Sequence, residues 1–424
     1  MGVHQGSSLA NKILVLNSGS SSLKWKLFSN DPANSLKAVV GGLVERIGTK
    51  DSQINATVYQ SLKPVKATFQ QEVPDHKAAL TAVLAYLKDS YSRAIQQEVH
   101  SIGHRVVHGK EIADAVLISP AVKDAIRKAS SLAPLHNPAN LQAIEAAEAV
   151  FKDRPQVAIF DTAFHQTMPP AAYMYALPYE LYESHHLRKY GFHGTSYKYL
   201  VGETSRLLAR PAEDLNLIVC HLGAGASIAA IENGRSIDTS MGLTPLEGLV
   251  MATRSGDLDP AVVLYLADRL KMEPSDIDKL LNKKSGWVGL CGSSDFRSLR
   301  KSIQEGDKRA QLAIEVFVWR LRKYIGAYMV HLKGRVDAFV FSGGLGENAH
   351  EIRKLALADL QAYGIDLDLD QNATASSSGA QAIHSADSRV QVWVIPTDEE
   401  LSIAQQTCEV VDAHEKQDHE AKAA

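Results

Sequence analysis

One pattern occurs twice in this sequence, roughly 200 residues apart. Residues 13–16 form an unbroken apolar run that predicts a buried strand, residues 17–22 form a loop of small polar side chains, and residues 23–27 alternate apolar with basic side chains. Residues 215–221 again predict a buried strand, and a small-residue loop and a returning strand follow it. Asn233-Gly234 then predicts a two-residue hairpin turn. A repeated supersecondary unit indicates two similar halves.

The bulk properties agree with two domains and exclude several classes of protein. A chain of 424 residues is too long for one hydrophobic core. The net charge of −3 gives no basic field for nucleic acid or for an anionic membrane. No apolar run approaches the ~18 residues of a membrane span, and the first ten residues lack the apolar core of a signal peptide. Three widely spaced cysteines favour a reducing cytoplasm.

Three loops rich in glycine or small residues each follow a predicted buried strand, near Ser20, Gly223 and Gly344. Backbone N–H groups in such loops, and at the start of a following helix, can bind phosphate. Lys24 comes just after the first loop, where its ammonium group could reach the same anion. Taken singly, each loop is equally typical of an ordinary polar turn. Together the loops predict a polyphosphate held between two similar halves.

Asn17, Asp161 and Glu399 each lie at the end of a predicted strand. A few oxygen ligands of this kind suit a Mg²⁺ ion that arrives with a nucleotide, although acidic residues after strands also cap helices. Arg105 and Arg254 lie in glycine-containing polar segments, GHRVVHG and MATRSGD. Arginine binds carboxylate or phosphate through two parallel hydrogen bonds, but a surface salt bridge is the more common role.

Eight segments in order make the sequence resemble the acetokinase family: LVLNSGSSSLK, GHRVVHG, FDTAFH, YGFHGTS, HLGAGAS, DTSMGLTPLEGLVMATRSGD, FSGGLGEN and PTDEE. The resemblance runs from about Lys12 to about Val411. It implies an α/β protein with the duplicated fold of actin, the 70-kDa heat-shock chaperones and sugar kinases. That fold has two similar domains, each with a mixed β-sheet flanked by helices, and a nucleotide cleft between them that closes on the substrates.

The resemblance also implies a domain division. Residues 12–162 with 396–412 would form the domain that binds the metal and the acyl substrate. Residues 163–395 would bind the nucleotide and make the contact of a homodimer. Residues 1–11 and 413–424 would be flexible tails.

The implied reaction is reversible phosphoryl transfer from ATP to acetate, which gives acetyl phosphate and ADP in the cytoplasm. Mg²⁺, for which Mn²⁺ can substitute, would be held by Asn17 and Glu399. Arg105 would bind the acyl substrate, and His193 and Arg254 would stabilise the transition state. A carboxylate is already a nucleophile at neutral pH, so we expect Asp161 to orient an arginine or the metal's waters rather than to remove a proton.

Two further sets of residues follow from the resemblance. The acyl methyl group would contact Val107, Leu135, Phe192 and Pro245. ATP would contact Lys24, His221, Leu222, Gly223, Ala224, Gly225, Asp295, Phe296, Arg297, Gly344, Leu345, Gly346, Glu347 and Asn348. Ala224 departs from the family, which usually has asparagine there, so one side-chain amide near the phosphates is missing. We expect altered phosphate contacts rather than lost activity.

Two alternatives stay open on the sequence alone. The first is a kinase for propionate or another short-chain acid, with the same catalytic groups and a wider acyl pocket. The second is a chaperone-like or actin-like ATPase. Such an ATPase would not need two arginines and a histidine around the terminal phosphate, and it usually carries an additional binding domain for which this chain has no residues left.

Overall fold

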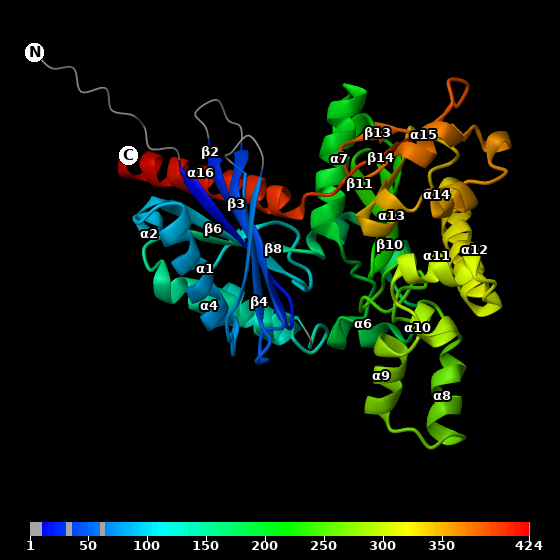
Figure 1. The fold of residues 1–424 in the computed structure, drawn as a ribbon, viewed down its shortest axis with the longest axis horizontal. Coiled ribbons are helices and arrows are strands. Elements are labelled where there is room, and N and C mark those ends of the chain that lie inside the picture. Colours follow the sequence, from blue (N-terminus) through cyan, green and yellow to red (C-terminus); the bar gives the residue numbers. More distant parts are fainter. Residues whose placement is uncertain (1–10, 31–35, 60–63, 135, 424) are drawn as a thin grey trace, which may run out of the picture. The chain divides into compact units, whose positions relative to one another are not determined.

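The computed structural model describes residues 11–30, 36–59, 64–134 and 136–423. The chain divides into two compact units (Figure 1). The first comprises Met1–Ala163 with Asp398–Ala424, and the second comprises Phe164–Thr397. The expected boundaries, before residue 163 and at residue 396, lie within two residues of these. None of the helices in the described ranges is both long and apolar enough to cross a membrane.

An eight-stranded sheet in the order β5-β4-β3-β2-β1-β6-β8-β7 forms the centre of the first unit. Strands β1, β6 and β8 are parallel, and the other pairs are antiparallel. The strands are β1 (Lys12–Ser18), β2 (Ser22–Asn30), β3 (Leu36–Glu45), β4 (Gln53–Val58), β5 (Val65–Gln70), β6 (Val99–Val106), β7 (Val116–Leu117) and β8 (Gln156–Phe160). The helices are α1 (His76–Ser90), α2 (Ile95–Glu98), α3 (Pro120–Ala129), α4 (Asn137–Val150) and α16 (Glu399–Ala423).

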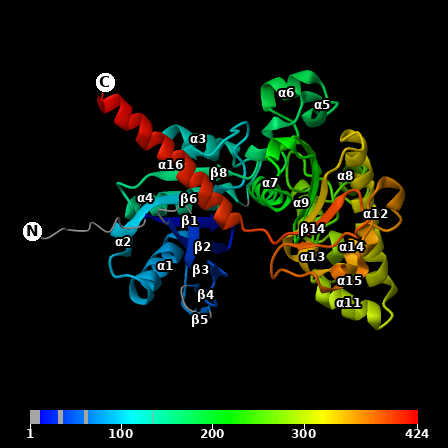
Figure 2. The same ribbon diagram turned by 90° about the horizontal axis from the view of Figure 1, so that it is seen from above.

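Helices cover both faces of this sheet, which explains the apolar run in β1. Leu14 and Leu16 belong to the core cluster that includes residues of α1 and α4. Ile13 and Val15 point the other way and belong to the cluster that includes Ile403 of α16. Figure 2 shows α16 extending across the strands of this unit. A strand buried on both faces reads as continuous apolar sequence rather than as an alternation.

A six-stranded sheet in the order β11-β10-β9-β12-β14-β13 forms the centre of the second unit. Its strands are β9 (Leu217–Leu222), β10 (Ala226–Glu232), β11 (Arg235–Thr239), β12 (Ala338–Ser342), β13 (Gln381–Ala382) and β14 (Gln391–Val394). Its helices are α5 (Pro170–Tyr173), α6 (Tyr179–His185), α7 (Gly194–Leu208), α8 (Pro260–Asp268), α9 (Pro274–Lys283), α10 (Gly286–Cys291), α11 (Phe296–Gln304), α12 (Lys308–His331), α13 (Gly343–Asn348), α14 (His350–Ala356) and α15 (Leu369–Thr374). The described residues also form 3₁₀ turns at Ala163–Thr167, Ala212–Asp214 and Gln361–Tyr363.

Six strands of the first sheet repeat the topology of the second sheet, which confirms the predicted duplication. In each unit three consecutive antiparallel strands (β3-β2-β1 and β11-β10-β9) are followed by two parallel strands (β6-β8 and β12-β14) and a two-residue antiparallel edge strand (β7 and β13). The predicted hairpin turn joins β10 to β11, with positive φ at Asn233 (52°) and Gly234 (73°). Asn-Gly favours this conformation.

The C-terminal segment differs from the expectation of a flexible tail from residue 413. Helix α16 continues to Ala423. Residues 413–423 (AHEKQDHEAKA) contain no glycine or proline and are rich in good helix formers, so a polar segment extends a helix whose start is anchored in the core. His100 Nε2 lies 3.2 Å from Glu415 Oε1 and ties this extension to β6.

Candidate active site

Arg105 lies near the end of β6, the strand between β1 and β8. The parallel register pairs Arg105 with Asn17 on one side, and Asp161 follows the end of β8 on the other. Arg105 Nε donates to Asp161 Oδ1 at 3.0 Å, Nη2 donates to Asp161 Oδ2, and Nη1 donates to Asn17 Oδ1 at 3.1 Å. Burial alone would lower the pKa of Arg105, but the Asp161 carboxylate holds it above its ordinary value. Asp161 therefore orients a charged guanidinium group.

Glu400, which the sequence analysis did not select, is the second buried carboxylate of this unit. It accepts from Lys24 Nζ at 2.7 Å and from Asn17 Nδ2 at 3.1 Å. Burial alone would raise the pKa of Glu400, but the Lys24 and Lys26 ammonium groups and the Asn17 amide hold it below its ordinary value. The predicted nucleotide contact Lys24 is thus bound to a carboxylate here. The PTDEE segment contained this signal, because two adjacent acids begin the helix.

Glu399 has the opposite electrostatic environment. Burial raises the pKa of Glu399, Arg105 opposes this shift, and the nearby Asp161 and Glu400 carboxylates add to it. Glu399 is therefore a carboxylate whose negative form its protein neighbours do not fully compensate, and a divalent cation would stabilise that form. Glu399 and Asn17 offer only oxygen donors, which suits an ion that keeps several waters and binds phosphate oxygens. Within the described ranges, no group of three or more His, Cys, Asp and Glu side chains gathers to hold a metal.

Two asparagines of α4 hold the loops around Arg105, and the sequence analysis missed both. Asn140 Oδ1 accepts from the backbone N–H of Val107 at 3.1 Å, and Asn140 Nδ2 donates to the carbonyl of Ser18 at 2.7 Å. Asn137 binds both backbone groups of His108. Val107 itself is buried. In the sequence, Asn137 stands in a proline-rich stretch and Asn140 at the start of an alanine-rich helical one, so only the fold identifies these two amides as supports.

In the second unit, the rings of His193 and His221 stack with their centroids 4.2 Å apart. His193 Nδ1 lies 2.8 Å from Ser227 Oγ, and His221 Nδ1 lies 2.9 Å from Ser196 Oγ. His193 has a φ of 59° at the start of α7, a left-handed conformation that few non-glycine residues adopt, although histidine is among the more tolerant of them. Such a conformation costs about 1 kcal/mol or more, and it is typical of functional sites.

Arg254 lies beside the loop that follows β9. A Cβ atom added at Gly225 would be 3.5 Å from Arg254 Nη1 and 3.5 Å from His193 Nε2, so both side chains converge on the backbone of this loop. Arg254 Nη1 donates to the carbonyl of Pro245 at 3.1 Å and lies 3.5 Å from Met251 Sδ. No carboxylate among the residues that the structure describes pairs with Arg254. Burial lowers the pKa of Arg254, so this charge is poorly solvated and would gain from a bound anion.

A hollow of about 630 Å³ lies next to the loop that follows β9. The structure brings eight of the predicted nucleotide contacts together in its lining: Gly223, Ala224, Asp295, Phe296, Arg297, Gly344, Leu345 and Asn348. Four lining residues were not predicted: Trp287, Ser294, Arg300 and Ala349. The others have different surroundings. His221 and Leu222 are buried in β9, and Gly346 and Glu347 are buried in α13. Asp295, which lines the hollow, also caps α11 by accepting from the N–H of Ser298.

The turn from β12 into α13 depends on a glycine and on a buried arginine. Gly343 has a φ of 76°, and a Cβ there would lie 2.6 Å from the carbonyl oxygen of Leu222, so only glycine fits without strain. The fully buried Arg353 donates to the carbonyls of Gly346 (2.8 Å) and Glu347 (2.9 Å) and to Asn372. Burial lowers the pKa of Arg353 to about 10. Nothing in the sequence around Arg353 indicated this role.

The predicted acyl-methyl pocket is not gathered in one unit. Val107 belongs to the first unit, whereas Phe192 and Pro245 belong to the second. Leu135 lies outside the described residues. Phe192 is buried, and its carbonyl lies 3.0 Å from His165 Nε2.

Comparisons with known proteins agree on one family. The acetokinase family model matches residues 12–405. An acetate kinase of Caldicellulosiruptor bescii is 49% identical over 400 residues, which cover 93% of this chain and 98% of the relative. The crystal structure of Porphyromonas gingivalis acetate kinase superposes with a TM-score of 0.87 at 41% identity, covering 95% of this chain and all of the other. A propionate kinase from Francisella tularensis superposes with a TM-score of 0.85, also at 41% identity, over 94% of this chain and all of the other.

Proposed function

The chain belongs to the acetokinase family, and from this premise we infer that it is an ATP-dependent kinase that transfers the terminal phosphoryl group of ATP to acetate, giving acetyl phosphate and ADP. The carboxylate of acetate attacks directly, without a covalent enzyme intermediate. Because this nucleophile needs no general base, catalysis consists of positioning the reactants and compensating charge on the transferred group.

The environment of Arg254 is the observation that supports this proposal most. A desolvated guanidinium group without a carboxylate partner among the described residues lies next to His193 and the loop after β9. Charge that develops on a transferring phosphoryl group would find both side chains in place. Fixed charges of this kind stabilise a transition state without reorganising during the reaction.

In the first unit, Arg105 is the proposed carboxylate-binding residue. Its Nε and Nη2 groups are bound to Asp161, which leaves donors on the terminal nitrogens for acetate. In this role Asp161 fixes the direction of the guanidinium fork and removes no proton. A divalent ion held by Asn17 and Glu399 would supply charge compensation at the phosphates of ATP. Because its donors are oxygens, we propose Mg²⁺, with Mn²⁺ as a substitute.

The hollow beside Gly223 and Gly344 is the proposed site of the nucleotide. Its lining includes Trp287 and Phe296, whose aromatic rings suit a purine base, and backbone N–H groups of two loops that suit phosphates. Ala224 is exposed there, and its carbonyl accepts from the N–H of Ala252 at 3.2 Å. The phosphate contacts at this position are therefore proposed to come from the backbone.

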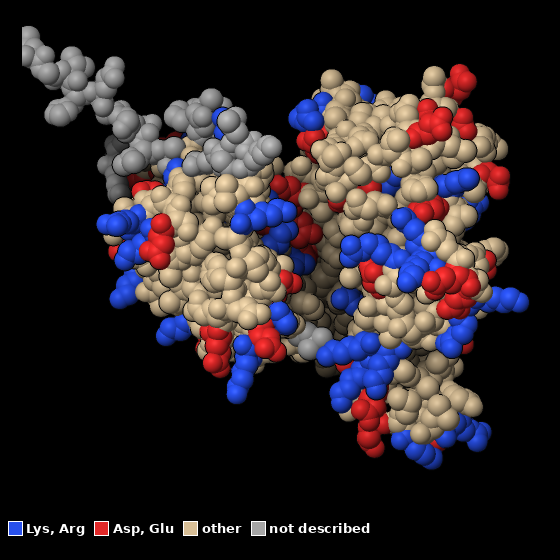
Figure 3. Space-filling model, in the orientation of Figure 1, with Lys and Arg blue, Asp and Glu red and all other residues tan. Residues whose placement is uncertain are grey.

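We further propose a cytoplasmic homodimer. Apolar side chains are exposed on α8 and α12, a surface that water disfavours and that a second copy would cover. The most exposed of them are Leu264 (70%), Trp319 (79%) and Val330 (76%). Acidic and basic side chains are interspersed over both units on the face that Figure 3 shows, a pattern with no preference for nucleic acid. The three free cysteines suit a reducing compartment.

The deciding experiment measures ATP turnover with acetate, with propionate and without any acid, trapping acyl phosphate as the hydroxamate. The proposal expects hydroxamate formation that depends on the acid and is fastest with acetate. Faster turnover with propionate would instead favour the propionate kinase alternative, which the solved relative from Francisella tularensis keeps relevant. A rate of ATP hydrolysis that is the same with and without either acid would contradict both kinase assignments and favour an ATPase.

A further inference from the structure

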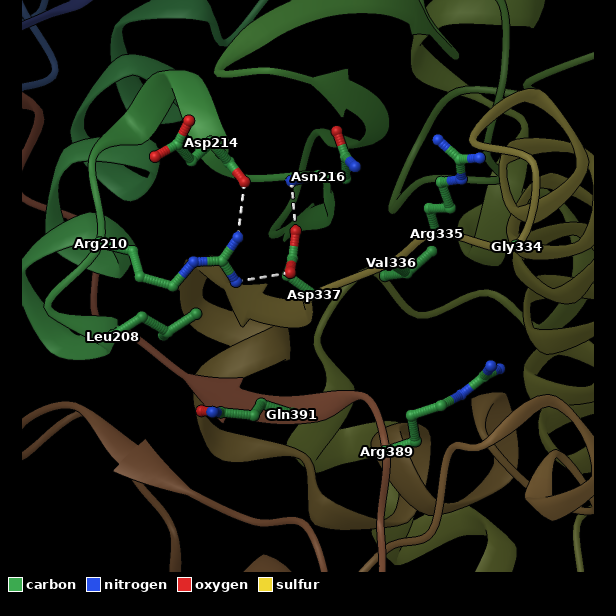
Figure 4. A pocket seen from close by; sticks show the side chains of 10 residues that line it. All are labelled: Leu208, Arg210, Asp214, Asn216, Gly334, Arg335, Val336, Asp337, Arg389 and Gln391. Atoms are coloured by element: carbon green, nitrogen blue, oxygen red, sulfur yellow. Dashed lines mark hydrogen bonds and ion pairs between the residues drawn. The ribbon is translucent and has the colours of Figure 1, made fainter.

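A second hollow, of about 530 Å³, lies in the second unit away from the nucleotide loops (Figure 4). Its lining comes from the segments that precede three neighbouring parallel strands: Asn216 before β9, Val336 before β12, and Gln391 at the start of β14. The nucleotide loops follow β9 and β12 at their other ends. The two hollows therefore lie at opposite edges of the same sheet, about 17 Å apart for a strand of five residues.

Three arginines line this hollow, and one of them, Arg210, pairs with a carboxylate. Arg210 Nη1 donates to Asp337 Oδ1 at 2.6 Å, and Arg210 Nη2 donates to the carbonyl of Asp214 at 2.7 Å. The other oxygen of Asp337 accepts from the N–H of Asn216 at 2.8 Å. Arg210 and Asp337 are thus a structural pair that holds the start of β9 against the start of β12.

Arg335 and Arg389 are the two remaining guanidinium groups. Arg389 Nη2 donates to the carbonyl of Tyr363 at 2.9 Å, which is a neutral acceptor. Arg335 is exposed and has no hydrogen-bond or ion-pair partner among the residues that the structure describes. Figure 4 shows both arginines on one side of the hollow, with their guanidinium groups apart and directed differently, and the carboxylate of Asp214 on the opposite side. This side of the hollow therefore carries two positive charges that none of the described carboxylates neutralises.

We propose that this hollow binds a small dianion, with Arg335 and Arg389 as its charged ligands. Two separate guanidinium groups suit the two carboxylates of one molecule, and either group alone suits a phosphate, because each presents a planar set of parallel donors. The amides of Asn216 and Gln391 add neutral donors and acceptors for hydroxyl or carbonyl groups. No aromatic ring lines the hollow, so a nucleotide base gains no stacking there. The volume lies within the range of small-molecule sites.

The test measures binding of two probes, succinate and inorganic phosphate, to the full-length protein by calorimetry, with the nucleotide hollow saturated with ADP. We expect at least one of the two probes to bind to the ADP-saturated protein. Tighter binding of succinate would identify dicarboxylates as the ligand class, and tighter binding of phosphate would identify phosphates. Arg335→Gln should weaken that binding roughly tenfold or more, since a lost charge-assisted hydrogen bond is worth at least one factor of ten. Arg335→Glu should weaken it further.

Arg335 is the decisive position because it has no structural contact to lose, whereas Arg389 also holds the carbonyl of Tyr363. Arg93→Gln is the matched control, because Arg93 is an exposed arginine of the first unit with no partner among the described residues. The control should bind the probe as the unmodified protein does. Both Arg335 variants should keep acetate kinase activity, which makes this test independent of the proposed catalytic roles. Absence of binding by either probe, or equal binding by the Arg335 and Arg93 variants, would overturn the proposal.

Discussion

Arg105 and Arg254 are the arginines proposed to bind anions in the two units, and their surroundings are opposite. Arg105 is bound to Asp161 and Asn17, and the Asp161 carboxylate raises its pKa. Arg254 has carbonyl and sulfur neighbours, and burial lowers its pKa. The first guanidinium is therefore stable and oriented before substrate arrives, whereas the second is poorly compensated until an anion arrives. The difference suits a residue that recognises a ground-state carboxylate and a residue that stabilises a transition state.

Arg254→Ala gives the largest expected effect. Removing a charge that acts on the transferring phosphoryl group should lower kcat by roughly 10³-fold or more, as for arginine fingers. The stability should change little, because the substitution also removes a poorly solvated charge. Steady-state kinetics and thermal unfolding measure the two effects. A kcat within tenfold of the unmodified enzyme would contradict the proposed role of Arg254 in the transition state. Unfolding of the variant would contradict the expectation that Arg254 contributes little to stability.

Asp161→Asn, in contrast to Arg254→Ala, should lower the stability of the protein clearly as well as affect its activity. It leaves Arg105 as a mostly buried charge without its carboxylate, and breaking such a pair costs about 3 kcal/mol. Denaturant unfolding should show this loss, and the KM for acetate should rise because the guanidinium is no longer held in place. Asp161→Ala serves as a second variant that lacks the side chain altogether. If unfolding is unchanged while kcat alone falls, Asp161 acts in the chemistry and the orienting role is wrong.

Glu399 and Glu400 sharpen the comparison within one unit, because their pKa values shift in opposite directions from 4.5. The native state binds fewer protons at Glu400, so its stabilisation is present above pH 4.5 and is lost as pH falls through the lowered pKa. The native state binds more protons at Glu399, so stability falls as pH rises from 4.5 through the raised pKa.

At pH 7, Glu400→Gln should lower the free energy of unfolding by about 1 kcal/mol, a modest loss because the Lys24 side chain is 53% exposed. Glu399→Gln should keep or increase stability, but it should lose the stabilisation that Mg²⁺ with ADP gives to the unmodified enzyme. Thermal unfolding at several pH values, with and without Mg²⁺-ADP, separates the two. Equal responses of both variants to Mg²⁺-ADP would contradict the metal assignment of Glu399.

Val107→Ala gives the smallest effect and tests the proposed place of Val107 in the acyl pocket. Shortening the side chain should raise kcat/KM for propionate relative to acetate several-fold, since one methylene is worth ~1–3 kcal/mol of discrimination. The measurement compares both acids with both proteins. An unchanged ratio would remove Val107 from the pocket.

The sequence by itself determined the duplication, because the order of a buried strand, a small-residue loop and a returning strand is a local pattern that each half repeats. It also determined the glycine-rich loops after the buried strands and the turn at Asn233-Gly234, where glycine and asparagine adopt conformations that other residues avoid. The motifs that identify the family are likewise contiguous segments, so they can be recognised without the fold. Helix α16 shows the limit of composition, since polarity from residue 413 onward indicated disorder but helix propensity continued the helix.

Only the tertiary structure decided which charges are compensated. Asn17, Arg105, Asp161 and Glu400 are far apart in the chain and meet because β1, β6 and β8 are parallel neighbours beside the start of α16. Asn140 and Arg353 likewise read as ordinary helix residues until the fold places them under the site's loops. Solvation and ion pairing depend on three-dimensional neighbours, so the contrast between Arg105 and Arg254 cannot be read from two similar glycine-containing segments.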